Sequence, residues 1–205
     1  SPRHIYSSFA LSYLDFNNYG SCFGRNLYCS EQAVYRRYVK NQHHIGCDTL
    51  FKTLKADLDA VMERDPAARN RAEVFFLYSG FKAVRSHRKA NWFLRHNMKF
   101  IARWSSQRSR HKTGIEIHPG ATIGKGLFID HGIGVLIGET TIIGDNCTIY
   151  QNVTLGGTGK DTGKRHPTLG NNVLVGSGAK VLGPFKVGDN ARIAAGAVVL
   201  SEIPP

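Results

Sequence analysis

From residue 117 onward, an aliphatic residue returns every six positions. A period of six fits neither an α-helix, whose faces repeat every 3.6 residues, nor an alternating strand, whose faces repeat every two. It predicts short parallel strands joined by tight turns, with three strands to a triangular coil of about 18 residues and the aliphatic side chains stacked inside. Thirteen such positions make about four coils. They are Ile117, Ile123, Ile129, Ile137, Ile143, Ile149, Leu155, Leu169, Val175, Val181, Val187, Ile193 and Val199.

The six-residue period breaks twice, and both breaks carry ionisable side chains. The spacing is eight between Ile129 and Ile137, and fourteen between Leu155 and Leu169. An insertion can leave such a stack as a loop without disturbing it, and loops on a rigid scaffold are frequent places for function. We therefore expect the functional chemistry in two segments: Asp130-His131-Gly132, and the stretch from Gly156 to Pro167.

Composition divides the chain near residue 116. Of its 22 glycines, 17 lie in residues 117–205, while residues 1–116 carry a net charge of +11 against +1 for the rest. We predict three regions: a poorly patterned extension of residues 1–45, an α-helical domain of residues 46–113 and a strand-and-turn domain of residues 114–205. Because no amphipathic Arg-rich helix is visible in residues 1–45, we interpret them as a locally ordered or frayed extension and not as a transit segment.

Apolar residues at helical spacing run through residues 49–112. The first helix, with Leu54 and Leu58 on its apolar face, is expected to end before Asp65-Pro66. Asp65 then looks like the N-cap of a second helix, with Pro66 at its first helical position. That helix is expected to end near Gly80 or soon after, and the residues on its apolar face are Val74, Leu77, Tyr78 and Phe81. A third helix is expected to place Ala90, Phe93, Leu94, Ile101 and Trp104 on one stripe, with Arg95, Lys99 and Arg103 on the opposite face.

The net charge of +12 comes largely from Val74–Ile115, which holds ten Lys or Arg and no acid. We interpret this charge as a solvated helical surface, with a phosphate-bearing ligand or a subunit contact as alternatives. Nucleic acid is not an expected partner, because neither a binding motif nor interleaved aromatic residues are present. No apolar run is long enough to span a bilayer, so no membrane partner is expected either. Four cysteines without a CxxC pair indicate neither a disulfide framework nor a zinc site, and we predict a cytoplasmic location.

In and around the two breaks of the six-residue period, the chain resembles the hexapeptide-repeat serine O-acetyltransferases. The similar segments are Gly114-Ile115-Glu116-Ile117-His118-Pro119, Phe128-Ile129-Asp130-His131-Gly132, Ile137-Gly138-Glu139-Thr140, Val153 to Lys160 and Gly163-Lys164-Arg165-His166-Pro167. The resemblance covers about Leu58 to Pro205, and residues 1–45 do not share it. It implies an α+β fold in which an N-terminal α-helical region is followed by a left-handed parallel β-helix.

The resemblance implies transfer of acetyl from acetyl-CoA to the hydroxyl of L-serine, which gives O-acetyl-L-serine for cysteine biosynthesis. A serine hydroxyl is a poor nucleophile until a base takes its proton, and a positioned histidine contributes about 10²–10⁴-fold. His131 matches the family's base, and Glu116 matches its acidic partner, where the family usually has Asp. Coils of about 18 residues would align Glu116 with residue 134, three positions from His131. We expect direct attack without an acyl-enzyme, because neither insertion carries a well-placed Cys or Ser nucleophile.

The family pattern also places four residues around the amino acid. They are Asp65, Asp130, Arg165 and His166. Arginine is suited to a carboxylate, and carboxylates are suited to an ammonium group. His118 is interpreted as structural.

Acetyl-CoA is the implied co-substrate, and no metal is implied. In the family it lies in a groove between neighbouring subunits of a trimer, where Gly157, Ser177 and Ala195 match the lining positions. Ser177 and Ala195 are 18 residues apart, which predicts the same face one coil on. The implied assembly is a homotrimer, alone or as a dimer of trimers. O-acetylserine sulfhydrylase as a partner stays undecided, because the isoleucine-ended tail that family members use for it is not present at Ile203-Pro204-Pro205.

Two other functions fit a prism of this kind. Another hexapeptide acetyltransferase would act on the hydroxyl of a sugar or a xenobiotic such as an antibiotic. A gamma-type carbonic anhydrase needs three histidines that converge on zinc, two of them at a short interval. His118, His131 and His166 lack that interval, so serine acetylation is the function we expect.

Overall fold

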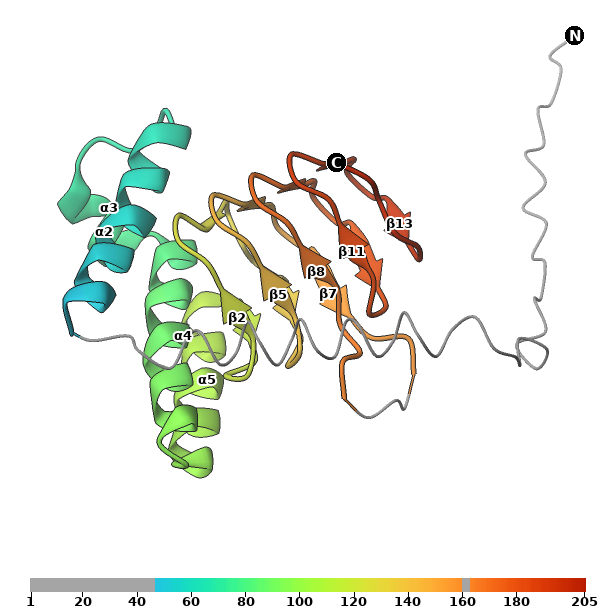
Figure 1. Cartoon of the computed structure of the whole chain (residues 1–205). Helices are drawn as coiled ribbons and strands as arrows, with labels where there is room; N and C mark the ends of the chain where they lie inside the picture. The colour runs from blue at the N-terminus through green and yellow to red at the C-terminus, as the bar shows by residue number, and fades with distance from the viewer. Residues whose placement is uncertain (1–46, 160–162) are drawn as a thin grey trace, which may run out of the picture.

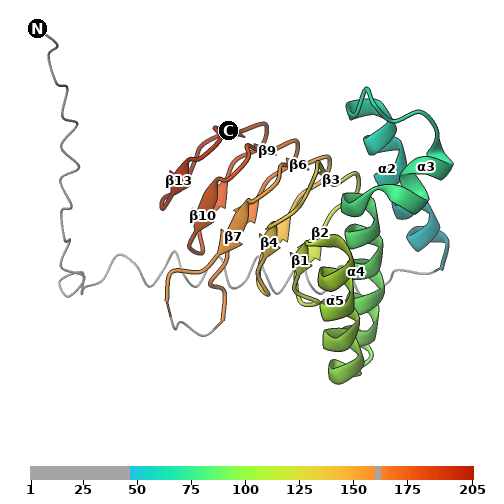
Figure 2. The same cartoon turned by 180° about the vertical axis from the view of Figure 1, so that it is seen from behind.

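The computed structural model describes residues 47–159 and 163–205, which form a group of helices followed by a three-sided prism of short strands (Figure 1). The helices lie at one end of the prism, against its first strands, and the C-terminus lies at the other end (Figure 2). The predicted extension of residues 1–45 lies outside the described residues. Helices first and parallel strands second is the predicted α+β order.

Before the prism, the described part of the chain holds four helices. They are α2 (Cys47–Arg64), α3 (Arg71–Leu77), α4 (Ser79–Arg95) and α5 (Lys99–Thr113). The first ends directly before Asp65, as the sequence predicts, but the prediction that Asp65 caps the second was wrong. Asp65 Oδ1 instead accepts the backbone N–H of Ala67 at 2.8 Å within a turn. The cap is Asn70, which accepts the N–H of Glu73 at 2.9 Å, and an Asn three residues before a Glu is itself an N-terminal signal.

The predicted end of the second helix was also wrong. The helix breaks at Tyr78, whose ψ of 118° is extended, and Gly80 is buried in the first turn of α4. A Cβ at Gly80 would overlap the carbonyl oxygen of Ile129, so glycine here lets α4 pack directly on β3 (Phe128–Ile129). The reason for this glycine is therefore a tertiary contact and not a helix end.

The predicted stripe from Ala90 to Trp104 belongs to two helices. Asn97 adopts a φ of 62° between α4 and α5, and this left-handed residue reverses the chain. Ala90 is buried, whereas Trp104 is 58% exposed, so the single stripe was a wrong prediction. The apolar spacing continued across the turn, and periodicity alone did not reveal it.

Within residues 114–159 and 163–205, the prism contains thirteen short parallel strands. They are β1 (Glu116–Ile117), β2 (Thr122–Ile123), β3, β4 (Leu136–Ile137), β5 (Ile142–Ile143), β6 (Thr148–Ile149), β7 (Thr154–Gly156), β8 (Thr168–Leu169), β9 (Leu174–Val175), β10 (Lys180–Leu182), β11 (Lys186–Val187), β12 (Arg192–Ile193) and β13 (Val198–Val199). The first sheet is β1-β4-β7-β10-β13, the second is β2-β5-β8-β11 and the third is β3-β6-β9-β12. Twelve of the thirteen predicted aliphatic positions are buried in one core, and only Val199 in the last strand is partly exposed. The predicted coil is confirmed.

The pairing register shows how the prism accommodates its two insertions. β4 pairs with β7 at Leu136 and Thr154, an 18-residue coil as predicted. β1 pairs with β4 at Glu116 and Leu136, 20 residues apart, and β5 pairs with β8 at Ile142 and Thr168, 26 apart. The first insertion therefore adds two residues and the second adds eight. Because of the two added residues, the predicted alignment of Glu116 with residue 134 was wrong.

A buried ion pair holds the helices against the prism. Arg88 of α4 donates to both carboxylate oxygens of Asp57 of α2, at 2.7 and 2.8 Å, and Asp57 is fully buried. Asp57 also accepts the N–H of Gly126 at 2.9 Å, and Arg88 donates to the carbonyl oxygen of Gly124 at 2.8 Å. A buried pair with these further hydrogen bonds fixes the helices on the first coil. It thereby sets where Asp65 stands relative to the strands.

Candidate active site

Seven of the nine predicted site residues lie at two corners of the prism, whereas Glu116 lies in β1 and Asp65 between α2 and α3. We call the turn from the third sheet to the first the His131 corner, and the turn from the first sheet to the second the Arg165 corner. The His131 corner holds Asp130, His131, Ser177 and Ala195. The Arg165 corner holds Gly157, Arg165 and His166, on the insertion that projects from the prism in Figures 1 and 2. The His131 corner precedes the N-terminal ends of the strands of the first sheet, and the Arg165 corner follows their C-terminal ends.

His131 stands exposed in the first insertion. Its side chain is 76% exposed, and its Nε2 lies 3.8 Å from Oδ1 of Asp130. Its φ of 55° is in the left-handed region, which costs a non-glycine residue about 1–2 kcal/mol. The N–H of Gly132 donates to the carbonyl oxygen of Asp130 at 2.6 Å and closes the turn. Strain of this kind clusters at functional sites, and here it presents an imidazole to solvent with a carboxylate beside it.

Tyr78 connects the helices to this corner. Its ring packs against the apolar cluster that contains Phe128 of β3, and its hydroxyl hydrogen-bonds to Asp65. Desolvation, this hydrogen bond, and the negative charges of Asp65, Glu73 and Asp130 raise the pKa of Tyr78. Asp65 is thus a hydrogen-bond partner of this hydroxyl, and the charge of Asp130, from a distant segment, also acts on it.

At the Arg165 corner, the second insertion folds back on Thr140, which follows β4. The N–H groups of Arg165 and His166 donate to Thr140 Oγ1 at 3.0 and 3.2 Å. Arg165 forms an ion pair with Glu139 at 2.5 Å, and the buried Lys164 donates to the carbonyl oxygen of Thr140 at 2.9 Å. Burial, with the positive charges of Arg165 and Lys164, lowers the pKa of His166 to about 4. Both predicted residues of this loop are therefore held by hydrogen bonds.

Glu116 has other partners than the predicted one. Its carboxylate pairs with Arg110 at 3.1 Å and with Arg103 at 3.6 Å, both from α5. The carboxylate within 4 Å of a His131 ring nitrogen is that of Asp130. Because both arginines are about half exposed, each pair contributes only about 0–1 kcal/mol. Its role beside His131 remains a prediction.

The three small residues predicted to line the acetyl-CoA groove lie on both corners. β9 pairs with β12 at Val175 and Ile193, so Ser177 and Ala195 occupy equivalent places one coil apart, which confirms their predicted stacking. The N–H of Gly196 donates to the carbonyl oxygen of Ser177 at 2.8 Å between these coils. Gly157 and Ala195 are exposed and Ser177 is half-buried. Their role in binding acetyl-CoA remains a prediction.

Four residues of this site were not selected from the sequence. They are Tyr78, Glu139, Thr140 and Lys164. The last three stand inside segments that resemble the family, and this position was the available signal. Tyr78 was expected on the apolar face of a helix. Only the helix break at this residue, and the packing of α4 on β3, bring its hydroxyl to Asp65.

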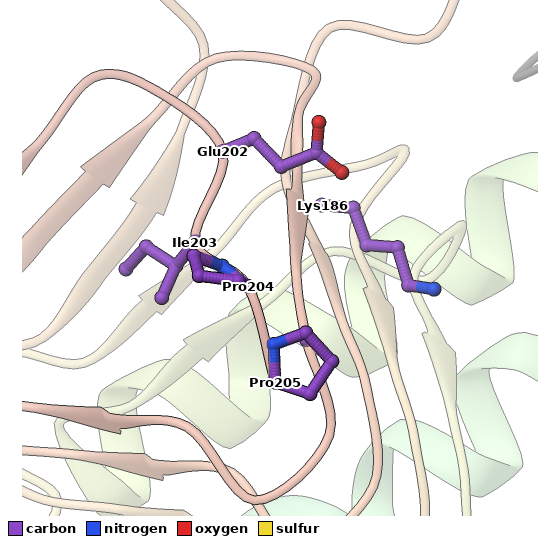
Figure 3. A pocket seen from close by; sticks show the side chains of 6 residues that line it. Lys186, Glu202, Ile203, Pro204 and Pro205 are labelled. Carbon is purple, nitrogen blue, oxygen red and sulfur yellow. The ribbon is translucent and has the colours of Figure 1, made fainter.

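No predicted site residue lines the cavity of about 400 Å³ at the C-terminal end of the prism (Figure 3). Its lining is Lys186, Gly188, Glu202, Ile203, Pro204 and Pro205. Across residues 47–159 and 163–205, no three His, Cys, Asp or Glu side chains come together in a way that could hold a metal ion. Within the same ranges, every helix is too short or too polar to cross a membrane.

A parallel prism of period six, with its reactive side chains on insertions at the corners, defines the class of hexapeptide-repeat transferases. The family described as bacterial transferase hexapeptide (six repeats) matches residues 166–201, and the family described as serine acetyltransferase, N-terminal, matches residues 29–86. The expectation that the resemblance begins at Leu58 was therefore wrong. The similarity extends into a segment that has no sustained apolar period and for that reason gave no signal.

The chain belongs to the serine acetyltransferase family. It is 62% identical over 151 residues to a serine acetyltransferase of Helicobacter pylori, with 74% of this chain and 88% of that one covered. It is 60% identical over 155 residues to one of Synechococcus elongatus, with 76% and 64% covered. The structure of Neisseria gonorrhoeae serine acetyltransferase in complex with serine matches with a TM-score of 0.75 and 39% identity, over 77% of this chain and 65% of that one. This chain thus spans slightly less than two thirds of the last two proteins. Its helices followed by a left-handed β-helix are the predicted fold class.

Proposed function

We propose that this chain is a serine O-acetyltransferase, which transfers acetyl from acetyl-CoA to the hydroxyl of L-serine and releases O-acetyl-L-serine and CoA. The product is the activated serine from which cysteine is made. Family membership and the similarity to a serine-bound structure support this proposal. The observation that carries it is the exposed His131 ring on a left-handed turn beside Asp130, because acylation of a hydroxyl needs an accessible base.

His131 acts as general base in a direct attack. A ring nitrogen takes the hydroxyl proton of L-serine as the serine oxygen forms a bond to the thioester carbonyl carbon. The tetrahedral adduct then collapses, the carbon–sulfur bond breaks, and the departing CoA thiolate takes the proton from the imidazolium. Glu116 is the proposed acidic partner that orients the ring. This role requires its carboxylate to share or exchange its present partners, Arg103 and Arg110.

The two corners bind opposite ends of the amino acid. Asp65 and Asp130 are suited to the ammonium group, because both are carboxylates whose charges act on the same tyrosine hydroxyl, that of Tyr78. Arg165 and His166 are suited to the carboxylate, which a guanidinium binds with two parallel hydrogen bonds. Glu139 is the ion-pair partner of Arg165. A substrate carboxylate would compete with it.

A complete site requires more than one copy of the chain. The base and the ammonium-binding residues lie at one edge of the first sheet, and Arg165 and His166 lie at the other. In a homotrimer, the His131 corner of one copy can meet the Arg165 corner of the next, and a threefold axis closes the ring. The same contact brings Gly157 towards Ser177 and Ala195 of the neighbour, which forms the groove for acetyl-CoA. A cytoplasmic location remains the prediction from the cysteine pattern, and the pairing of trimers and O-acetylserine sulfhydrylase binding stay open.

A thiol-release assay tests the proposal. The purified chain is given acetyl-CoA with L-serine, D-serine, L-threonine, a galactoside or chloramphenicol, and free CoA is measured with a thiol reagent. We expect release that depends on L-serine and yields O-acetyl-L-serine by mass spectrometry. Release with the sugar or the antibiotic but not with L-serine would assign the chain to another hexapeptide acetyltransferase. No release above the acceptor-free control would contradict acetyl transfer.

A further inference from the structure

The ring of His166 is held at one nitrogen by Thr140. The backbone N–H of Thr140 donates to His166 Nδ1 at 3.2 Å, and Thr140 Oγ1 lies 2.8 Å from the same nitrogen. A backbone N–H can only donate, so Nδ1 must be the acceptor and carries no proton. The ring is therefore neutral, and its single proton is on Nε2.

The hydroxyl of Thr140 is consistent with this tautomer. Its oxygen accepts the N–H of Arg165 at 3.0 Å and that of His166 at 3.2 Å, which uses both lone pairs. The hydroxyl proton is then left to point at Nδ1. Thr140 and His166 are 7% and 8% exposed, so these bonds form with little competition from water.

Lys164 adds a buried charge to the same loop. It is 3% exposed, and its Nζ donates to the carbonyl oxygens of Thr140 and His166. A neighbouring cation disfavours a second proton on the imidazole. The Arg165 and His118 side chains act in the same direction, and Glu139 opposes them. These are the charged and titratable groups that face the His166 ring.

We infer that Thr140 and Lys164 are positioning residues that hold His166 as a neutral imidazole whose Nε2–H remains as a hydrogen-bond donor. Gly138 makes this orientation possible, because a Cβ there would overlap Nε2 and Cδ2 of the ring. The inference rests on the proposed function for its substrate: His166 donates to an oxygen of the amino acid and does not compete with His131 for the hydroxyl proton. The two histidines thus differ because one is exposed and the other is buried among cations.

Nuclear magnetic resonance tests the tautomer directly. Long-range ¹H–¹⁵N spectra of the full chain labelled with ¹⁵N-histidine separate the two neutral tautomers from the charged ring, and the His166→Gln variant assigns the signal. We expect the Nε2–H form at neutral pH, without titration from about pH 6 to pH 8. A proton on Nδ1, or a charged ring at neutral pH, would overturn the inference. This measurement needs no altered loop and does not depend on activity.

Variants test the two positioning residues. Thr140→Val removes the hydroxyl and Lys164→Met removes the charge, and each should raise the pKa of His166 by about one unit or more. Thr140→Ser keeps the hydroxyl and should restore the wild-type value. Lys180→Met is the matched control, because Lys180 Nζ also donates to a backbone carbonyl, that of Asn152 at 2.8 Å. It should leave the pKa of His166 unchanged.

Kinetics separate positioning from folding. In Thr140→Val the backbone N–H of residue 140 is the one donor left to Nδ1, so the ring is held less firmly, and KM for L-serine should rise about 2- to 10-fold while kcat changes little. Equal pKa values for wild type, Thr140→Val and Lys164→Met would overturn the positioning roles. If the tautomer is found and no acceptor releases CoA, the proposed function fails and the assignment of the ring stands.

Discussion

The helical region and the prism are stabilised by different kinds of contact. In the prism, a buried aliphatic side chain in every strand from β1 to β12 and a set of parallel hydrogen bonds recur from coil to coil. The helices depend on contacts that occur once, such as the Asp57–Arg88 pair and the hydrogen bond from Ser106 to the carbonyl oxygen of Ile117 at 2.7 Å. Each of many repeated contacts contributes a small part of the free energy of unfolding, whereas a contact that occurs once contributes a large part. Removal of one helix contact should therefore lower the free energy of unfolding by more than removal of one contact between coils of the prism.

The largest expected effect concerns chemistry and not stability. His131→Asn removes the base but suits the left-handed turn, because asparagine adopts positive φ readily. We expect kcat to fall about 10²–10⁴-fold with an unchanged unfolding midpoint. His111→Asn, on the exposed face of α5, is the control and should keep full activity. Activity near wild type in His131→Asn would remove the base from this corner and place the chemistry elsewhere.

The second prediction compares a single buried contact with an exposed one. Asp57→Ala leaves Arg88 buried without its partner and should lower the free energy of unfolding by about 3–5 kcal/mol. Asp59→Ala breaks the exposed pair with Arg71 and should cost about 0–1 kcal/mol. Urea titration of both variants measures the difference. Equal losses would show that the ion pair is not what fixes the helices.

The third prediction is a pH dependence. Burial and the charge of Arg88 lower the pKa of His87 in α4 to about 3, below its ordinary value of 6.5. Between these values the unfolded chain binds a proton that the folded chain does not. The free energy of unfolding should therefore fall as the pH falls from about 6.5, by about 1.4 kcal/mol per pH unit from this group.

Urea titrations at several pH values check this slope. His87→Gln should remove about that much of it, whereas His96→Gln, at an exposed position, should not. The lowered pKa of His166 acts in the same direction, so some slope will remain from the prism. A His87→Gln variant with the full wild-type slope would contradict the assignment.

The fourth prediction concerns the contribution of the helices to the site. Tyr78→Phe keeps the ring in its apolar cluster and removes the hydroxyl that bonds to Asp65. We expect KM for L-serine to rise about 2- to 10-fold, the equivalent of one hydrogen bond, with little change in kcat. Phe75→Leu, in the same cluster, is the control for packing. Unchanged kinetics in Tyr78→Phe would separate the helices from substrate binding.

The smallest expected effect comes from the loss of one of the hydrogen bonds that recur between coils of the prism. Asp145 Oδ1 accepts the N–H of Lys125 at 2.8 Å, and Asn171 and Asp189 form equivalent bonds in the following coils. Asp145→Ala should lower the free energy of unfolding by about 0.5–1.5 kcal/mol, because one partly exposed hydrogen bond is lost. Urea titrations of Asp145→Ala and Asp57→Ala compare the two losses of free energy of unfolding. A loss as large as that of Asp57→Ala would contradict the distinction between repeated and single contacts.

The prism was predictable because its signal repeats. Each aliphatic position is one of thirteen, so the two irregular spacings were visible as insertions of two and eight residues. The helix boundaries at Asn70 and Tyr78 were missed, because each depends on one local competition between possible caps and breaks. Gly80 was interpreted as a helix end for a different reason. The residue that it contacts, Ile129, is distant in sequence, and nothing in the local pattern points to it.

By itself, the amino-acid order determined the triangular coil, the two insertions and the residue types that suit a hydroxyl acylation. These features follow from periodicity and from chemistry that each side chain carries wherever it stands. Only the tertiary structure decided which of these side chains meet: Asp65 with Tyr78, Glu116 with the arginines of α5, and His166 with Thr140. The physical reason is that hydrogen bonds and ion pairs act over a few ångströms, and the docking of helices on strands sets those distances.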